Sequence, residues 1–179
     1  MSRLIDGVVL SAAVAVAAHW SGLLLIVGTH PVPGWAPGGA LLGVALIVGL
    51  SRRSAPARPG PNRWRWALAL LTLIGCLAGG LADAFARYHL LEPYGPGGCR
   101  AVARETAFLF AGSGQVYTGH VIGPMGIAWR GTSWTADDGH RPIAAGDYEL
   151  SWGFGGGSLV VEGSDGDPVW PALHGVDCG

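Results

Sequence analysis

A long apolar run divides the chain: residues 66–82 read WALALLTLIGCLAGGLA. The run contains no formally charged side chain, and Trp64 and Trp66 stand at its start. A helix of about 20 apolar residues crosses a bilayer core of about 30 Å. Aromatic side chains are common at the ends of such helices, where the membrane meets water. The run therefore predicts a transmembrane helix over about residues 66–86.

Two more apolar runs precede this one. Residues 8–28 carry no formal charge, and residues 35–50 follow a turn rich in Pro and Gly. Both lengths are compatible with a membrane span, although the second is short. Together the runs predict a three-helix transmembrane region over residues 1–87. A cleaved signal peptide is the alternative for the first run, and a re-entrant or interfacial segment is the alternative for the second.

The loop between the second and third runs indicates the orientation. Residues 51–65 contain five Arg and no acidic residue. Basic residues are enriched in cytoplasmic loops of membrane proteins. We therefore expect a cytoplasmic loop, a cytoplasmic N-terminus and an extracytoplasmic segment after residue 87. The protein is thus predicted to be a multi-pass cell-membrane protein.

The composition agrees with a membrane protein. Half of the 179 residues are apolar and 13% are charged, whereas a soluble domain carries about 25% charged residues. All eleven basic residues are Arg, which is typical of a bacterial genome rich in G and C. Residues 88–179 contain four Arg against ten Asp or Glu. The high apolar fraction argues against a disordered chain. The excess of acidic residues in this half argues against a nucleic-acid partner.

The pattern changes after residue 87. A linker is expected over residues 88–98, followed by short runs of strand character over residues 99–179. TAFLF at 106–110 is followed by AGSG at 111–114, which has the composition of a turn. YELSWGF at 148–154 alternates polar and apolar residues. Short strands with frequent turns predict a small all-β domain, an antiparallel sandwich or barrel.

The three cysteines fall into two groups. Cys76 lies inside the third apolar run, whereas Cys99 and Cys178 bracket the predicted β domain. Disulfides form outside the cytoplasm, which is where the arginine pattern places this domain. The sequence therefore predicts a disulfide between Cys99 and Cys178, with two free thiols as the alternative.

Asp137, Asp138 and His140 form the densest polar cluster of the predicted β domain. Carboxylates beside an imidazole can bind a metal or transfer protons. However, Asp138-Gly139 is a strong turn signal, and adjacent turn residues seldom all face one ion. A solvated turn is therefore the favoured interpretation, and no metal site or catalytic residue is predicted.

Two other groups are candidate functional residues. Trp170 and Trp134 belong to the predicted β domain, and any Trp that remains exposed there is a candidate contact for a partner or a sugar ring. Trp170 lies between two prolines and is the first choice. His19 lies within the first apolar run, where a polar residue is uncommon. A neutral His that bonds to a neighbouring helix is the simpler interpretation of His19.

These observations predict a non-enzymatic membrane protein of the cell envelope. It contacts membrane lipid and acts as an accessory or interaction subunit for another membrane or envelope protein. No cofactor is expected. One alternative is an extracytoplasmic module that binds a cell-wall sugar, a peptide or an ion. The other alternative is a metal-dependent envelope hydrolase that uses Asp137, Asp138 and His140.

Overall fold

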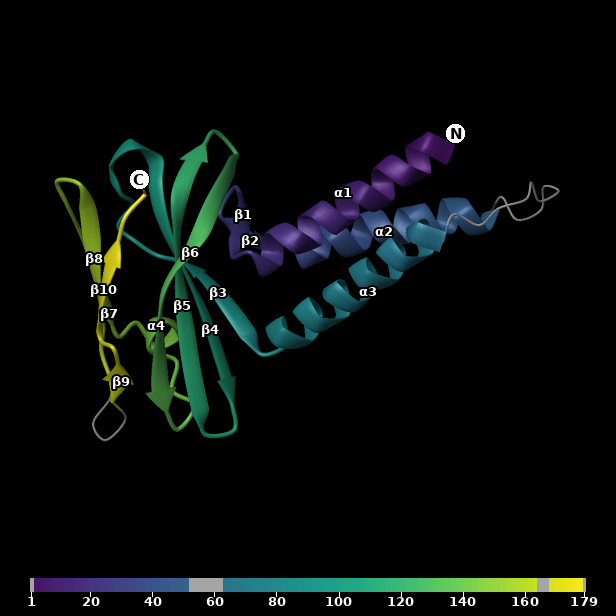
Figure 1. Cartoon of the computed structure of the whole chain (residues 1–179). Helices are drawn as coiled ribbons and strands as arrows, with labels where there is room; N and C mark the ends of the chain where they lie inside the picture. The colour runs from purple at the N-terminus through teal and green to yellow at the C-terminus, as the bar shows by residue number, and fades with distance from the viewer. Residues whose placement is uncertain (1, 52–62, 164–167, 179) are drawn as a thin grey trace. The chain divides into compact units, whose positions relative to one another are not determined.

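The computed structural model describes residues 2–51, 63–163 and 168–178. The chain forms two compact units: residues 1–21 and 33–81 make the first, and residues 22–32 and 82–179 make the second. The first unit is helical and the second is built mainly from strands (Figure 1). The second unit thus combines a short N-terminal segment with the C-terminal half of the chain.

Three helices make up the first unit: α1 (Ser2–Trp20), α2 (Trp35–Ser51) and α3 (Arg63–Asp83). Nε of Arg65, at the start of α3, lies 2.7 Å from Oδ1 of Asp6, near the start of α1. A Cβ atom on Gly38, early in α2, would lie 2.7 Å from Cγ2 of Val16, late in α1. The helices α1 and α3 therefore run in the same direction, and α2 runs in the opposite direction.

Apolar composition distinguishes the three helices. Among the described residues, only α3 is both long enough and apolar enough to cross a membrane. The apolar parts of α1 and α2 are shorter, Leu4–Trp20 and Trp35–Val48. The segment predicted as the second span is thus helical. The segment predicted over residues 66–86 is helical as far as Asp83, and the strand β3 (Ala86–Leu90) begins at Ala86. Most of the predicted basic loop 51–65 lies outside the described residues.

The expectation of one helix over residues 8–28 is wrong. The helix ends at Trp20, and Gly22 has a φ of +91°, a left-handed conformation that glycine adopts without steric cost. Residues Leu23–Val27 form the strand β1 instead, which pairs with the distant strand β6. A short apolar run has no periodicity that separates a buried strand from a helix, so the pairing with β6 decides the outcome.

A seven-stranded antiparallel sheet forms most of the second unit. Its strand order is β2-β1-β6-β5-β4-β3, and β9 pairs with β6 beyond this path. The strands other than β1 are β2 (His30–Pro33), β3 (Ala86–Leu90), β4 (Cys99–Phe108), β5 (Ala111–Ile122), β6 (Met125–Asp137) and β9 (Val169–Trp170). The predicted linker 88–98 is therefore partly sheet, because β3 pairs with β4 along its whole length.

A second antiparallel sheet covers part of the first one (Figure 1). Its strands, in spatial order, are β10 (Leu173–Val176), β8 (Gly156–Val161) and β7 (Tyr148–Gly153). A short helix, α4 (Pro142–Ala145), and a 3-10 turn, η1 (Pro96–Gly98), complete the unit. Ala103 and Trp134 of the first sheet share one buried core with Leu150 and Leu159 of the second. The predicted antiparallel β domain is thus confirmed.

One predicted turn is instead part of a strand. The residues AGSG at 111–114 lie in β5, and the turn between β4 and β5 falls on Leu109 and Phe110. A Cβ atom on Gly114 would overlap the indole of Trp134, so this glycine serves close packing. Glycines within strands often mark such close approaches. The composition of AGSG therefore reflects packing rather than a change of chain direction.

Candidate functional site

The predicted disulfide between Cys99 and Cys178 is confirmed. Cys99 is the first residue of β4, and Cys178 follows β10 after one residue. The bond joins residues separated by 79 positions and closes residues 99–178 into one loop, which leaves β1, β2 and β3 outside it. It also fastens the last strand of the second sheet to the first sheet.

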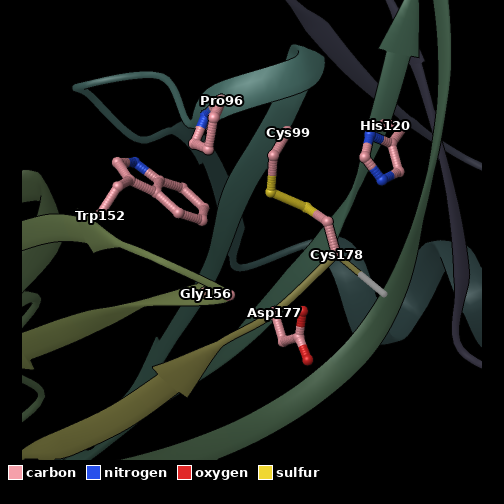
Figure 2. Close-up of a pocket in the computed structure, with 8 residues that line it drawn as sticks. Pro96, Cys99, His120, Trp152, Gly156, Asp177 and Cys178 are labelled. Atoms are coloured by element: carbon pink, nitrogen blue, oxygen red, sulfur yellow. A yellow bond between two sulfur atoms is a disulfide. The ribbon is translucent and has the colours of Figure 1, made fainter.

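A cleft of about 280 Å³ opens beside this disulfide. Trp152 and Pro96 lie on one side of it in Figure 2, and His120 and Asp177 lie near the disulfide. The cleft lies between the turn that joins β7 to β8 in the second sheet and the start of β4 in the first sheet. Its volume is just below the lower end of the range for small-molecule sites, about 300–1,000 Å³.

The indole of Trp152 is a fixed wall of the cleft. Its Nε1 donates a hydrogen bond of 2.7 Å to the carbonyl oxygen of Pro93. Cβ atoms on Gly95 and Gly157 would lie within about 3 Å of the ring, so the backbone approaches it closely at both glycines. This restraint holds the ring in place, so it can act as a stacking surface.

The polar groups of the cleft are one imidazole and one carboxylate. His120 and Asp177 are both exposed. Among the described residues, no group of three or more His, Cys, Asp or Glu side chains could hold a metal ion. The cleft can therefore accept a small polar or ring-shaped group by hydrogen bonding and stacking.

An exposed apolar surface continues from His120 across the same face of the first sheet. Leu23 pairs with Trp129 and Leu25 pairs with Ile127, and His120 also pairs with Ile127, so these side chains share one face. We call this surface the β1–β6 face. Its members are Leu23, Leu25, Val27, Ile122, Met125, Ile127 and Trp129, of which the last five are exposed.

The second sheet does not cover the β1–β6 face. The core between the sheets contains residues of β4, β5 and β6 such as Ala103, Val116 and Trp134, and none of the residues of this face. Contiguous exposed apolar surface on a folded domain commonly marks a binding surface. The β1–β6 face is therefore a candidate surface for contact with a partner.

The candidate cluster at the 137–140 turn is not brought together as a metal site. Asp137 and Asp138 are exposed, and Asp138 has a φ of +50° in the turn. Nε2 of His140 lies 3.5 Å from Oδ2 of Asp147, a carboxylate that is not part of the predicted cluster. Asp137 and Asp138 are thus solvated as expected for a turn, whereas the side chain of His140 is only 19% exposed.

The two predicted tryptophan contacts differ in burial. Trp170 on β9 is 79% exposed, whereas Trp134 is 2% exposed and packs beside His174. The expectation that Trp134 contacts a partner is therefore wrong, because its ring fills the space that Gly114 leaves in the core. Trp170 stays a candidate contact.

His19 lies at the end of a helix rather than at the centre of a span. It is the penultimate residue of α1, and its ring contacts that of Trp20 edge-on at 5.8 Å. The predicted central position is wrong because the helix ends eight residues before the apolar run does.

A buried carboxylate that the sequence analysis missed organises the 138–147 segment. Glu105 is 1% exposed and accepts hydrogen bonds of 2.9 Å from the backbone N–H groups of Ile143 and Ala144. These N–H groups lie at the start of α4 and have no partner within a helix of this length. The alternation of apolar residues through Cys99, Ala101 and Ala103 places residue 105 on the buried face of the strand. This alternation is the sequence pattern from which the burial of Glu105 could have been predicted.

A second missed cluster surrounds the end of α3. Arg104 donates from Nε to Oδ1 of Asp83 at 2.7 Å and from a terminal nitrogen to the carbonyl oxygen of Ala82. Tyr88 donates its hydroxyl to the second oxygen of Asp83 at 3.0 Å. Burial of the ring, together with the Asp83 carboxylate, raises the pKa of Tyr88. The cluster is therefore a structural ion pair with a protonated tyrosine.

No protein-family model matches the chain, and no curated protein or solved structure is significantly similar to it. The fold and the site define a chain of three helices with a disulfide-closed antiparallel β domain.

Proposed function

We propose that the chain is a non-enzymatic integral membrane protein that presents its β domain outside the cell and binds another membrane or envelope protein. The observation that carries this proposal is the β1–β6 face, an exposed apolar surface on the β domain. A monomeric soluble domain seldom leaves such a surface in water.

The exposed surface of α3 supports membrane insertion. The helix has 21 residues, and the side chains of Leu71, Ile74, Leu77 and Leu81 are more than half exposed. Exposure of these side chains to water is costly, whereas lipid tails accommodate them. The same helix is long enough to cross a bilayer core of about 30 Å.

Strand pairing supports a crossing by α2 as well. The strand β1 precedes α2, β6 follows α3, and the two strands pair with each other. Both strands must therefore lie on one side of a membrane, and the chain between them must cross an even number of times. If α3 crosses, α2 must cross too, although its 17 residues span only about 26 Å.

The remaining topology follows from charge and redox chemistry. The basic loop before α3 favours a cytoplasmic position at the start of this helix. The antiparallel order of the helices within the first unit then gives three spans with a cytoplasmic N-terminus. The disulfide agrees with an extracytoplasmic β domain, because disulfides persist outside the cytoplasm.

Cysteine accessibility tests this topology. Cys76 is replaced by Ala, and a single cysteine is placed at Thr29, between β1 and β2, or within the loop 52–62. A membrane-impermeant maleimide applied to intact cells is expected to label position 29 but not the loop. Labelling of the loop, or protection of position 29, would contradict the three-span topology.

Purification from native membranes tests the interaction. We expect a stoichiometric partner to co-purify with the unmodified protein in mild detergent and to be lost with Ile127→Glu in the β1–β6 face. Leu173→Glu is the matched control, because Leu173 is 66% exposed on the second sheet and lies outside this face. Recovery of a monodisperse protein without a partner would overturn the interaction function.

The cleft beside the disulfide supports one second candidate, a ligand-binding module. The fixed Trp152 ring together with His120 and Asp177 suits a sugar ring or a small polar group. Under this alternative, a cell-wall sugar or peptide raises the unfolding temperature, and Trp152→Ala abolishes the increase. The same ligand screen without any increase would remove this candidate.

A further inference from the structure

Four exposed apolar side chains gather near the end of α3. Phe108, Leu109 and Phe110 form the tip of the hairpin between β4 and β5, and the ring centroid of Phe85 lies 5.3 Å from that of Phe108. The exposed fractions of the four side chains range from 54% for Phe85 to 79% for Phe110. We call these four residues the aromatic tip.

The backbone of the tip makes this composition unexpected. Leu109 has a φ of +53°, in the left-handed region that disfavours a branched side chain. Two-residue hairpin turns with positive φ are dominated by Asn and Gly. A Leu-Phe turn therefore accepts both backbone strain and the exposure of two large apolar side chains. Such a combination indicates a functional requirement at this turn.

The chain connection places the tip beside the end of α3. Phe85 follows Asp83, the last residue of this helix, by two residues, which can span at most about 7 Å. Arg104 of β4 donates hydrogen bonds to Ala82 and Asp83, so the strand that leads into the tip is also bonded to the last two residues of α3. Wherever α3 leaves a membrane, the aromatic tip lies next to that point.

The charges around the tip are of both signs. Arg141 donates to the carbonyl oxygen of Phe85 at 2.8 Å, whereas Asp137 pairs with Ala111 beside the turn, and Asp138 follows it. This mixture favours neither anionic nor cationic headgroups. Contact with a membrane would therefore depend on the apolar side chains and not on lipid charge.

We propose that the aromatic tip inserts into the outer interface of the bilayer that α3 spans. The inference rests on the proposed membrane anchoring and adds a second, non-helical contact with lipid. The side chains of Phe108, Leu109 and Phe110 lie at the headgroup–acyl boundary, where the Phe and Leu side chains of interfacial segments are buried. The tip thereby restrains the β domain against the membrane surface.

Depth-dependent fluorescence tests this insertion in the full-length protein. Cys76 is replaced by Ala, and Leu109→Cys or Phe110→Cys carries an environment-sensitive dye in phosphatidylcholine vesicles. We expect phosphatidylcholine with a nitroxide high on its acyl chain to quench the dye at both positions and aqueous iodide to have little effect. Replacing part of the phosphatidylcholine by anionic lipid should leave the quenching unchanged.

Phe154→Cys is the matched control. Phe154 is also an exposed aromatic residue in a hairpin turn, between β7 and β8, but no helix end adjoins it in the chain. Its dye is expected to respond to iodide and not to the lipid nitroxide. Each labelled variant should retain the disulfide and the unfolding midpoint of the unmodified protein, and Phe110→Cys serves if Leu109→Cys does not fold.

A label at Ile74 separates the two proposals. A dye on Ile74→Cys, in the middle of α3, reports whether this helix lies in the bilayer at all. If lipid quenches position 74 while positions 109 and 110 behave like position 154, the tip proposal fails and the anchor stands. If position 74 is not quenched, both fail. Protection of the tip from both quenchers means that protein covers it, which also overturns the proposal.

Discussion

Asp83 carries a negative charge at the C-terminal end of α3, where the helix dipole disfavours an anion. The Asp83 side chain is 5% exposed, and its charge is compensated by the guanidinium of Arg104, whose side chain is 14% exposed. Removing one partner of a buried ion pair leaves the other without compensation. We therefore expect Arg104→Ala to lower the free energy of unfolding by about 3–5 kcal/mol in denaturant titrations.

The double variant Asp83→Asn with Arg104→Ala checks that the ion pair is the cause. Because this variant removes both charges, it should recover a large part of the stability lost in Arg104→Ala. If both variants were equally unstable, packing of the Arg104 side chain, and not its charge, would explain the loss.

His174 predicts a pH dependence of stability. The side chain is 1% exposed, and Nδ1 lies 3.0 Å from the Thr132 hydroxyl. Burial lowers the pKa of His174 from its ordinary value of 6.5, although a backbone hydrogen bond opposes this effect. Above pH 6.5 the imidazole is neutral in both states. Below it the unfolded chain takes up a proton first, so stability falls as the pH is lowered.

The expected slope for this single proton is at most about 1.4 kcal/mol per pH unit below pH 6.5. Denaturant titrations at several pH values between 7.5 and 5.5 measure it. His174→Asn keeps a polar group near Thr132 and should reduce the slope. An unchanged slope in this variant would assign the pH dependence to other residues.

At the scale of elements, glycines set how closely the helices pack. A Cβ atom on Gly79 of α3 would lie 2.9 Å from the Cβ of Trp35 at the start of α2, whereas one on Gly43 would meet nothing within 4 Å. Overpacking costs about 1–3 kcal/mol. We expect Gly79→Leu to lower the thermal unfolding midpoint in detergent and Gly43→Leu to leave it nearly unchanged. Equal effects would contradict this packing.

Element types were predictable where the pattern was local. The segments predicted at 35–50 and 66–86 form α2 and α3, since uniform apolar composition over such lengths favours a helix, although α3 ends at Asp83. The prediction failed at 23–27 and at 111–114. In both places the outcome depends on a distant strand: β6 pairs with β1, and Trp134 of β6 packs on Gly114. Local composition does not encode such contacts.

At the scale of the whole molecule, the disulfide restrains the unfolded β domain. The closed loop of 79 positions corresponds to about 4.5 kcal/mol in the chain-entropy model. We expect Cys99→Ser with Cys178→Ser to lower the free energy of unfolding of the β domain by up to this amount. Reduction of the unmodified protein with dithiothreitol should have the same effect. A loss well below 1 kcal/mol would show that packing of the two sheets stabilises the β domain without the disulfide.

The sequence by itself determined the helical character of the two apolar segments that form α2 and α3, the β character of the C-terminal half and the cysteine pair, because hydropathy, turn composition and residue placement are properties of local segments. Only the tertiary structure decided that Leu23–Val27 is a strand of the β domain and that Trp129 is exposed while Trp134 is buried. The same holds for the exposed tip at Phe108, Leu109 and Phe110. Burial depends on which strands cover a face, and strand pairing joins segments too far apart in the chain for their local patterns to specify.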